Sequence, residues 1–337
     1  MTEKLVKLTE VSLRDGSHSV SHQFTEEQVG AVVTALDEAG MHYIEVSHGD
    51  GLGGSTLQYG KSLVDEMKLI ETAVAAAKSS KIAVLLIPGI GTVHELKQAH
   101  ELGAKLVRVA THVTEADVSA QHIAKAKELG MEALGFLMMA HSAPVEKLVE
   151  QAKLMESYGA EAVYITDSAG ALLPDQVRER VRALRQELTC EVGFHAHNNL
   201  SLAVANTLIA IEEGATRIDS SVCGLGAGAG NTQTEVLTAV LDLMGKNPGL
   251  DIYKMMDLAQ NVVTPIMKRP QIVDKGSLAL GYSGVYSSFL IHSERAAKKF
   301  GLDPRDILIE LGKRKVVGGQ EDMILDVASE LAKMKQL

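Results

Sequence analysis

The sequence has no tryptophan, only 4% aromatic residues and just two cysteines, Cys190 and Cys223, among 337 residues. Two cysteines without a CxxC pattern argue against a disulfide framework and a zinc ribbon. The net charge is −10 without a basic cluster, so nucleic acid and anionic membranes are poor partners. The N-terminus is too polar for a signal peptide, and no apolar run reaches the roughly 18 residues of a spanning helix. These absences predict a soluble cytoplasmic protein.

What the sequence does contain is an alternation of short apolar runs with longer segments of helical period. The runs that predict strands are residues 5–13, 42–47, 81–87, 105–110, 131–138, 161–166, 191–197 and 216–222. Helix-like segments lie between them, for example 25–39, 91–102 and 144–158, and several are followed directly by glycine.

This repeated strand–helix pattern predicts parallel strands with right-handed crossovers, and therefore an α/β fold of the (β/α)8 TIM-barrel type. The runner-up, a doubly wound sheet, would need a GxGxxG turn after its first strand, which "LRDGSHS" does not supply. The pattern loosens around residues 264–284, and helical sequence follows. We expect a catalytic barrel domain over residues 1–263 and a small helical domain over residues 264–337.

Two histidines one residue apart, His195 and His197, end the seventh predicted strand. Residues i and i+2 of a strand point to one side, so both imidazoles share a face with Gly193, which we expect to look into the barrel. In a closed barrel this strand lies two strands from the first, which brings Asp15 near the pair. Two imidazoles and a carboxylate form a common divalent-metal site, and two hydrogen-bonded loop histidines are the alternative.

The loop after the first predicted strand carries Arg14, Asp15, His18 and His22. Arg14 is a candidate to bind a substrate carboxylate or an enolate oxygen, and an ion pair with Asp167 is its alternative role. His18 is the preferred general base because it lies closer to Arg14 and Asp15 than His22 does, and His22 stays the second candidate.

Other residues near the ends of the predicted strands bear on whether the site uses a metal, an imine-forming lysine or a phosphate group. No lysine follows a predicted strand, which argues against imine chemistry and leaves a metal as the electrophile. The glycine-rich "CGLGAGAGN" lacks the P-loop lysine and predicts a tight turn over the barrel rather than a phosphate or CoA contact. Asn198 or Asn199 could support His197 from behind. Three further histidines are expected to be hydrogen-bonded loop residues: His48, His112 and His141.

Several motifs together resemble the 4-hydroxy-2-oxovalerate aldolases, metal-dependent pyruvate aldolases of bacterial meta-cleavage pathways for aromatic compounds and sterols. They include "TEVSLRDGSHSVSHQFT", "VSHGDGLGGST", "YITDSAGALLPDQV", "GFHAHNNLSLAVANT" and "GYSGVYSSFLIHSERA". "LRDG" with "HAHNN" is typical of the wider family that also holds isopropylmalate synthases and hydroxymethylglutaryl-CoA lyases. "GVYSSFL" narrows the resemblance to the aldolases.

The resemblance implies retro-aldol cleavage of 4-hydroxy-2-oxopentanoate to pyruvate and acetaldehyde. It implies a divalent cation, usually Mn²⁺ with Mg²⁺ or Co²⁺ as alternatives, held by Asp15, His195 and His197. Arg14 would stabilise the pyruvate enolate and His18 would be the catalytic base. The substrate-binding residues would be Arg14, Asp15, Ser168, His195 and Tyr286, with Tyr282 as the residue most easily confused with Tyr286.

The resemblance also implies a hetero-oligomer, expected as a heterotetramer, with an acylating acetaldehyde dehydrogenase that receives the aldehyde through a tunnel. The C-terminal helices are the expected contact surface. One alternative is an acyl-CoA Claisen enzyme or lyase of the isopropylmalate synthase or hydroxymethylglutaryl-CoA lyase type. It would call for a larger C-terminal domain, or for a cysteine within the glycine-rich loop, which Cys223 only precedes. A non-catalytic scaffold is the other alternative.

Overall fold

The computed structural model describes residues 6–335, which contain a closed barrel of eight parallel strands. The strands are β1 Lys7–Glu10, β2 Tyr43–Glu45, β3 Lys81–Leu86, β4 Leu106–His112, β5 Glu132–Met138, β6 Ala162–Asp167, β7 Glu191–Ala196 and β8 Arg217–Ser220. Each strand pairs with the next along the chain, and β8 closes the barrel on β1. The predicted barrel is therefore confirmed, although Leu5, where the first predicted strand begins, lies outside the described residues.

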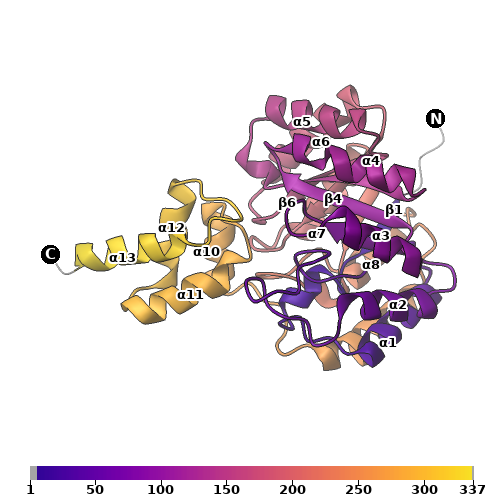
Figure 1. Cartoon of the computed structure of the whole chain (residues 1–337), viewed down its shortest axis with the longest axis horizontal. Helices are drawn as coiled ribbons and strands as arrows, with labels where there is room; N and C mark the ends of the chain where they lie inside the picture. The colour runs from indigo at the N-terminus through magenta and orange to yellow at the C-terminus, as the bar shows by residue number, and fades with distance from the viewer. Residues whose placement is uncertain (1–5, 336–337) are drawn as a thin grey trace.

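Helices cover the outside of the barrel (Figure 1). They are α1 Glu26–Glu38, α2 Glu66–Ala76, α3 Val93–Leu102, α4 Ala120–Glu128, α5 Val145–Ser157, α6 Pro174–Glu187, α7 Ala203–Glu212, α8 Thr234–Leu243 and α9 Ile252–Asp257. Thr25 and Thr92 form capping boxes at the starts of α1 and α3, which satisfies backbone N–H groups there. Gly103 ends α3 at φ 114°, a conformation that glycine adopts without strain.

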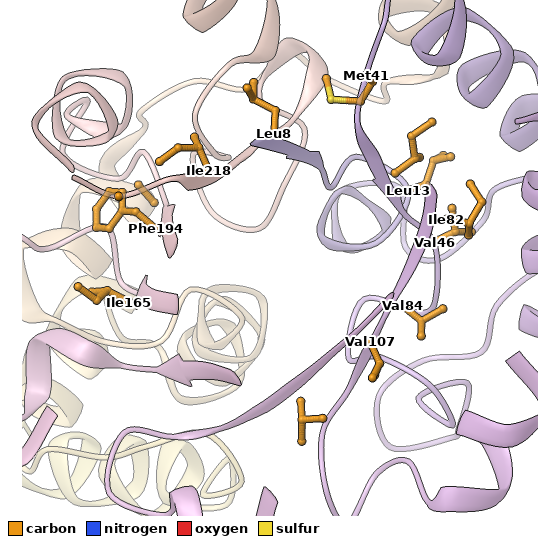
Figure 2. Close-up of a cluster of buried hydrophobic side chains, with 14 of the residues drawn as sticks. Leu8, Leu13, Met41, Val46, Ile82, Val84, Val107, Ile165, Phe194 and Ile218 are labelled. Carbon is orange, nitrogen blue, oxygen red and sulfur yellow. The ribbon is translucent and has the colours of Figure 1, made fainter. Parts of the chain in front are cut away.

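The hydrophobic core lies mainly between the strands and this helical layer. Leu8, Ile165, Phe194 and Ile218 point outward from different strands into it (Figure 2). The interior of the barrel is different, because it mixes aromatic side chains with charged ones. A Cβ at Gly193 would lie only 2.5 Å from the Tyr164 ring, so the glycine-containing face of β7 does look inward, as the sequence predicts.

The C-terminal helices form a lobe to one side of the barrel (Figure 1). They are α10 Lys275–Ser283, α11 Phe289–Phe300, α12 Pro304–Lys313 and α13 Met323–Lys335. Their buried apolar residues, including Leu280, Phe289, Ile307 and Val327, form a core separate from that of the barrel. Within residues 6–335, no helix combines the length and the apolar character that crossing a membrane requires.

Candidate active site

The chain turns sharply after β1, and this turn places the first site residues. β1 ends at Glu10, and a 3-10 helix spans Asp15–His18, so the extended geometry expected up to residue 13 is wrong there. A Cβ at Gly16 would lie 2.9 Å from Leu225, which explains a glycine at this position. Because Arg14 and Asp15 lie in a turn and not in a strand, their side chains can face the same cavity.

Asp15 and the two histidines of β7 meet at the carboxyl end of the barrel. One donor atom from each of Asp15, His195 and His197 lies within 4.8 Å of the other two, and all three residues are buried. The Nε2 atoms of His195 and His197 are 3.4 Å apart. Asn231 Nδ2 donates to Asp15 Oδ2 at 2.7 Å, which fixes the carboxylate from the glycine-rich loop.

The protonation states of this group suit a metal. Burial alone would raise the pKa of Asp15, but the positive charge of Arg14 beside it is the largest opposing cause, and that pKa is held well below its ordinary value. Burial lowers the pKa of His197 to about 4, although Asp15 acts in the opposite direction. An ionised carboxylate beside neutral imidazole is the donor set that divalent transition metals bind, so these residues fit such an ion.

His195 is oriented by a carboxylate behind it. Its Nδ1 faces Asp219 Oδ2 at 2.8 Å, which leaves Nε2 to face the site. Asp219 in turn accepts from Arg108, and Arg108 also donates to Glu45. Such a partner fixes the tautomer and ring orientation of a ligating histidine.

Arg14 is held in a fixed direction by two carboxylates. Its Nε donates to Glu45 Oε2 at 2.7 Å and its Nη1 to Asp15 Oδ1 at 2.9 Å. Its Nη2 is buried and has no hydrogen-bond partner among the described residues. The predicted alternative pair with Asp167 is not formed, because that carboxylate accepts from the backbone of Ala171 and Leu172.

These charged groups form one chain of contacts through the barrel interior, from Arg14 through Glu45, Arg108 and Asp219 to His195. Sequence reasoning missed Glu45, Arg108 and Asp219. A signal was available: each is a charged residue in the interior of a predicted strand, in "HYIEVS", "KLVRVA" and "TRIDSSV". Buried charges persist only when they are paired, so such residues predict a shared interior network.

A small cavity of about 20 Å³ lies beside the metal-donor group. Its lining comprises Arg14, Asp15, Gly49, Leu85, Ile87, Phe136, Met138, Thr166, Ser168, His195, His197 and Tyr286. Six of the predicted site residues are therefore brought to one place. Tyr286 comes from the C-terminal lobe, whereas Tyr282 is 78% exposed and does not line the cavity.

His18 is the predicted site residue that does not line this cavity. It lies behind Gly49, where an added Cβ would be 2.6 Å from its Nε2. His22 faces the His18 ring edge-on at 5.2 Å and stacks on His48 at 3.7 Å. Burial and the charges of His18 and His48 lower the pKa of His22 to about 2. The more enclosed His22 is therefore less suited to exchange protons than His18.

A second group of possible metal donors is formed by His18, His22 and Asp50, again within 4.8 Å of one another. His22 Nδ1 already lies 3.1 Å from Ser17 Oγ. The first group is fully buried, and a carboxylate supports one of its imidazoles from behind. It is therefore the stronger candidate for a resident cation.

The other polar residues considered in the sequence analysis form hydrogen bonds within the loops and strand ends around the cavity. His48 and His141 hydrogen-bond with Gly60 and Gly284, as expected for loop histidines. His112 hydrogen-bonds with Thr114, but it is the last residue of β4 and does not lie in the loop. Asn199 does not support His197; its side chain bonds Ala169, Ser287 and Ala229. The glycine-rich loop folds over the barrel, and the backbone N–H of Ala227 points to Asp15 Oδ2 at 3.4 Å.

Comparisons with known proteins agree on one family. The HMGL-like family matches residues 5–262, and the DmpG-like communication domain matches residues 271–333. A "4-hydroxy-2-oxovalerate aldolase" of Bacillus thuringiensis is 77% identical over 334 residues, 99% of this chain and 98% of its own length. Proteins of the same name from Geobacillus stearothermophilus and Moorella thermoacetica are 69% and 59% identical, each covering at least 98% of this chain and 96% of its own length.

Solved structures show the same fold at low identity. The N-terminal domain of a putative aldolase from Bacteroides vulgatus matches with a TM-score of 0.75 and 22% identity, over 88% of this chain and 98% of that one. The carboxyl transferase domain of Rhizobium etli pyruvate carboxylase matches with a TM-score of 0.83 and 17% identity, over 98% of this chain and 61% of that one.

Proposed function

This chain belongs to the 4-hydroxy-2-oxovalerate aldolases of the HMGL-like family, and from that membership we propose how its residues carry out the reaction. It is a carbon–carbon lyase that cleaves 4-hydroxy-2-oxopentanoate to pyruvate and acetaldehyde in a retro-aldol step dependent on a divalent metal. The observation that carries the proposed mechanism is the meeting of Asp15, His195 and His197 beside the free Nη2 of Arg14.

In this proposal Asp15, His195 and His197 hold the cation, and Mn²⁺ suits their mixed oxygen and nitrogen donors. When bound, the cation supplies an electrophile that stabilises negative charge developing on the 2-oxo acid. Asp219 keeps His195 Nε2 facing the site through its contact with Nδ1.

The bond that breaks joins C3 and C4 of the substrate. His18 takes the proton of the C4 hydroxyl, directly or through one water, and acetaldehyde forms as the C3–C4 electrons move toward the 2-oxo group. Arg14 Nη2 donates to the oxygen where this charge collects. C3 of the pyruvate enolate then takes up a proton from water, and His18 releases to solvent the proton that it accepted. Arg14 suits this task because Glu45 and Asp15 fix its guanidinium before the charge develops. Ser168 and Tyr286 contact the substrate across the cavity.

The acyl-CoA alternative has no support in the site. The Cys223 thiol donates to the backbone of Ala259 at 3.4 Å and does not line the cavity. The C-terminal region matches a communication domain over residues 271–333.

That domain supports a protein partner. We propose an acylating acetaldehyde dehydrogenase, in a heterotetramer, which would take up the aldehyde product. Exposed apolar residues of the C-terminal helices offer it a contact surface: Leu278 is 49% exposed, Tyr282 78% and Ile291 50%.

The experiment that tests the proposed function measures pyruvate release from 4-hydroxy-2-oxo acids of five and six carbons, without any partner protein. After exhaustive chelation, turnover should be lost, and Mn²⁺ should restore it to a higher level than Mg²⁺. Full turnover of the chelated protein would contradict the metal mechanism, and no turnover with any added cation would contradict catalysis by the chain alone.

A further inference from the structure

Tyr286 reaches the cavity from the segment between α10 and α11 of the C-terminal lobe. The next residue, Ser287, is buried at 3% exposure. Its Oγ donates to the backbone oxygen of Ser168 at 2.8 Å and accepts from Asn199 Nδ2 at 2.9 Å. The residue beside Tyr286 is therefore bonded to the loop after β6, which carries Ser168, and to the loop after β7, which carries the metal-donor candidate His197.

Asn199 joins four parts of the chain. Besides Ser287, its Nδ2 donates to the backbone oxygen of Ala169 at 2.9 Å, and its Oδ1 accepts from the backbone N–H of Ala229 at 2.9 Å. Both amide hydrogens and the oxygen are thus used, in a side chain that is fully buried. The packing is tight, because a Cβ at Gly228 would lie 2.5 Å from Asn199 Oδ1.

The two hydrophobic cores are separate, so hydrogen bonds are a main link between this segment and the barrel. Besides the Ser287 side chain, the Ser287 backbone N–H donates to the Ser168 oxygen at 3.4 Å, and His141 Nε2 lies 3.0 Å from the backbone oxygen of Gly284. Buried hydrogen bonds of the Ser287–Asn199 kind have defined directions and are costly to leave unmade. They are therefore suited to set the place of the neighbouring tyrosine.

The position of Tyr286 matters because the cavity is small. A shift of about 1 Å in a group that orients substrate can cost on the order of 100-fold in rate. The Tyr286 hydroxyl stays protonated near neutral pH, since burial and the carboxylates of Asp50 and Asp15 raise its pKa above the ordinary value. It can therefore serve as a hydrogen-bond donor to a carboxylate or carbonyl of the substrate.

We infer that Asn199 and Ser287 are positioning residues that hold the Tyr286 hydroxyl over the catalytic cavity and so link the C-terminal lobe to the cleavage step. This inference rests on the proposed substrate contact of Tyr286. It assigns neither Asn199 nor Ser287 a contact with substrate or metal, since neither lines the cavity.

A double-mutant cycle on the full chain tests the inference. The variants are Ser287→Ala, Tyr286→Phe and the combination, with kcat/KM for 4-hydroxy-2-oxopentanoate measured per folded, metal-loaded chain. Ser287→Ala removes both hydrogen bonds of the Ser287 hydroxyl and should lower kcat/KM roughly three- to tenfold, a loss of the size that hydrogen bonds contribute. In the Tyr286→Phe background, the same change should cost less than about twofold, because the group it positions is gone.

Ser288→Ala is the matched control, since the neighbouring Ser288 makes no side-chain cap bond at the start of α11 and should leave kcat/KM unchanged. Ser287→Cys keeps a weak donor of similar size and should recover part of the loss in kcat/KM. If Ser287→Ala does not fold, Ser287→Cys replaces it in the double-mutant cycle. Equal losses for Ser287→Ala in both backgrounds would overturn the inference. An unchanged kcat/KM for Tyr286→Phe would instead contradict the proposed role of Tyr286.

Discussion

The two ends of the barrel both carry buried charges, but only one has the groups needed for catalysis. At the carboxyl end, Asp15, His195 and His197 converge beside the unpaired Nη2 of Arg14. At the amino end, Arg217 is paired with Glu132 and Glu191, and Lys7 contacts Glu191 at 3.2 Å. The two groups of metal donors found in residues 6–335 both lie on loops and strand ends at the carboxyl side.

The larger of the two cavities lies at the amino end of the barrel, opposite to the end that carries the metal-donor groups. A cavity of about 640 Å³ lies at the amino end, lined by residues such as Lys81, Lys105, Glu132 and Glu161. Some of these cations and anions pair with one another; Lys81, for example, lies 3.7 Å from Glu132. The cavity at the carboxyl end is about 20 Å³. The convergent, buried donor groups favour the carboxyl end as the candidate site despite its smaller volume, and this is the end at which TIM-barrel enzymes place their chemistry.

The largest effect should come from removing the arginine of the carboxyl end. Arg14→Ala should lower kcat by roughly 1,000-fold, about 4 kcal/mol, with KM less affected, because the guanidinium acts mainly on charge that develops in the transition state. Steady-state pyruvate release measures both constants. Arg14→Lys should restore little, since an ammonium cannot keep both carboxylate contacts and still reach the substrate. An unchanged kcat would remove Arg14 from this role.

The arginine of the amino end should show the reverse behaviour. Arg217→Ala should lower the free energy of unfolding by about 3 kcal/mol, because it removes the buried guanidinium that pairs with both Glu132 and Glu191 and leaves them only the more exposed Lys81 and Lys7. Because both carboxylates are partly exposed, the expected loss of unfolding free energy lies near the low end of the range for breaking a buried ion pair. Urea denaturation measures the loss, while kcat per folded molecule should stay unchanged. A large drop in kcat of the folded variant would contradict the claim that the amino end contributes to stability and not to catalysis.

Glu66 is a buried carboxylate outside the charged groups at the two ends of the barrel, and its titration should make the stability of the protein depend on pH. Gly53 N–H donates to Glu66 Oε1 at 2.6 Å, while Oε2 is buried without a partner. Burial raises the pKa of Glu66 from 4.5 to about 7. Its contribution to stability is therefore present below pH 4.5 and lost as the pH rises through 7, a change of up to about 3 kcal/mol.

Glu66→Gln should remove this part of the pH dependence and make the protein more stable than the wild type at pH 8. By contrast, the ion pairs of Asp15, Glu45 and Asp219 hold the pKa values of these carboxyls below their ordinary range, so they should not titrate there. Thermal unfolding of both proteins at several pH values gives the comparison. Parallel curves would contradict the assignment to Glu66.

A smaller effect should come from the carboxylate behind the metal-donor histidine. Asp219→Asn should weaken Mn²⁺ binding roughly 10- to 100-fold, because it removes the charge that fixes the His195 ring. Glu132→Gln, the matched change at the amino end, should leave the affinity unchanged. Titration of the chelated proteins with Mn²⁺, followed by electron paramagnetic resonance, measures both. Equal affinities in the two variants would show that Asp219 does not tune the site.

The sequence predicted those features that depend on local pattern. Alternating apolar runs and helical segments indicated the eight strands and their order. The i, i+2 spacing brought His195, on β7, and His197, just after it, to the same place. Sequence reasoning failed for features whose geometry is determined by contacts between residues far apart in the chain. The turn that brings Arg14 and Asp15 together depends on packing of Gly16 against Leu225, which lie far apart in the sequence.

The interior charge network is the other feature that sequence reasoning missed. Glu45, Arg108 and Asp219 lie on three strands, and their pairing follows from barrel closure rather than from any local motif. Asn198 or Asn199 was expected to support His197, but the Asn199 side chain bonds Ser287, a contact that depends on where the C-terminal lobe packs. The roles of His18, Ser168 and Tyr286 stay predictions that kinetics must test.

The central claim is that Asp15, His195 and His197 hold the cation required for cleavage. It is tested most directly by counting Mn²⁺ bound per chain after equilibrium dialysis of the wild type, His197→Ala and His22→Ala. The second variant removes a donor of the other candidate group. We predict about one tightly bound Mn²⁺ in the wild type and in His22→Ala, and none in His197→Ala. Full binding by His197→Ala together with its loss in His22→Ala would contradict the claim.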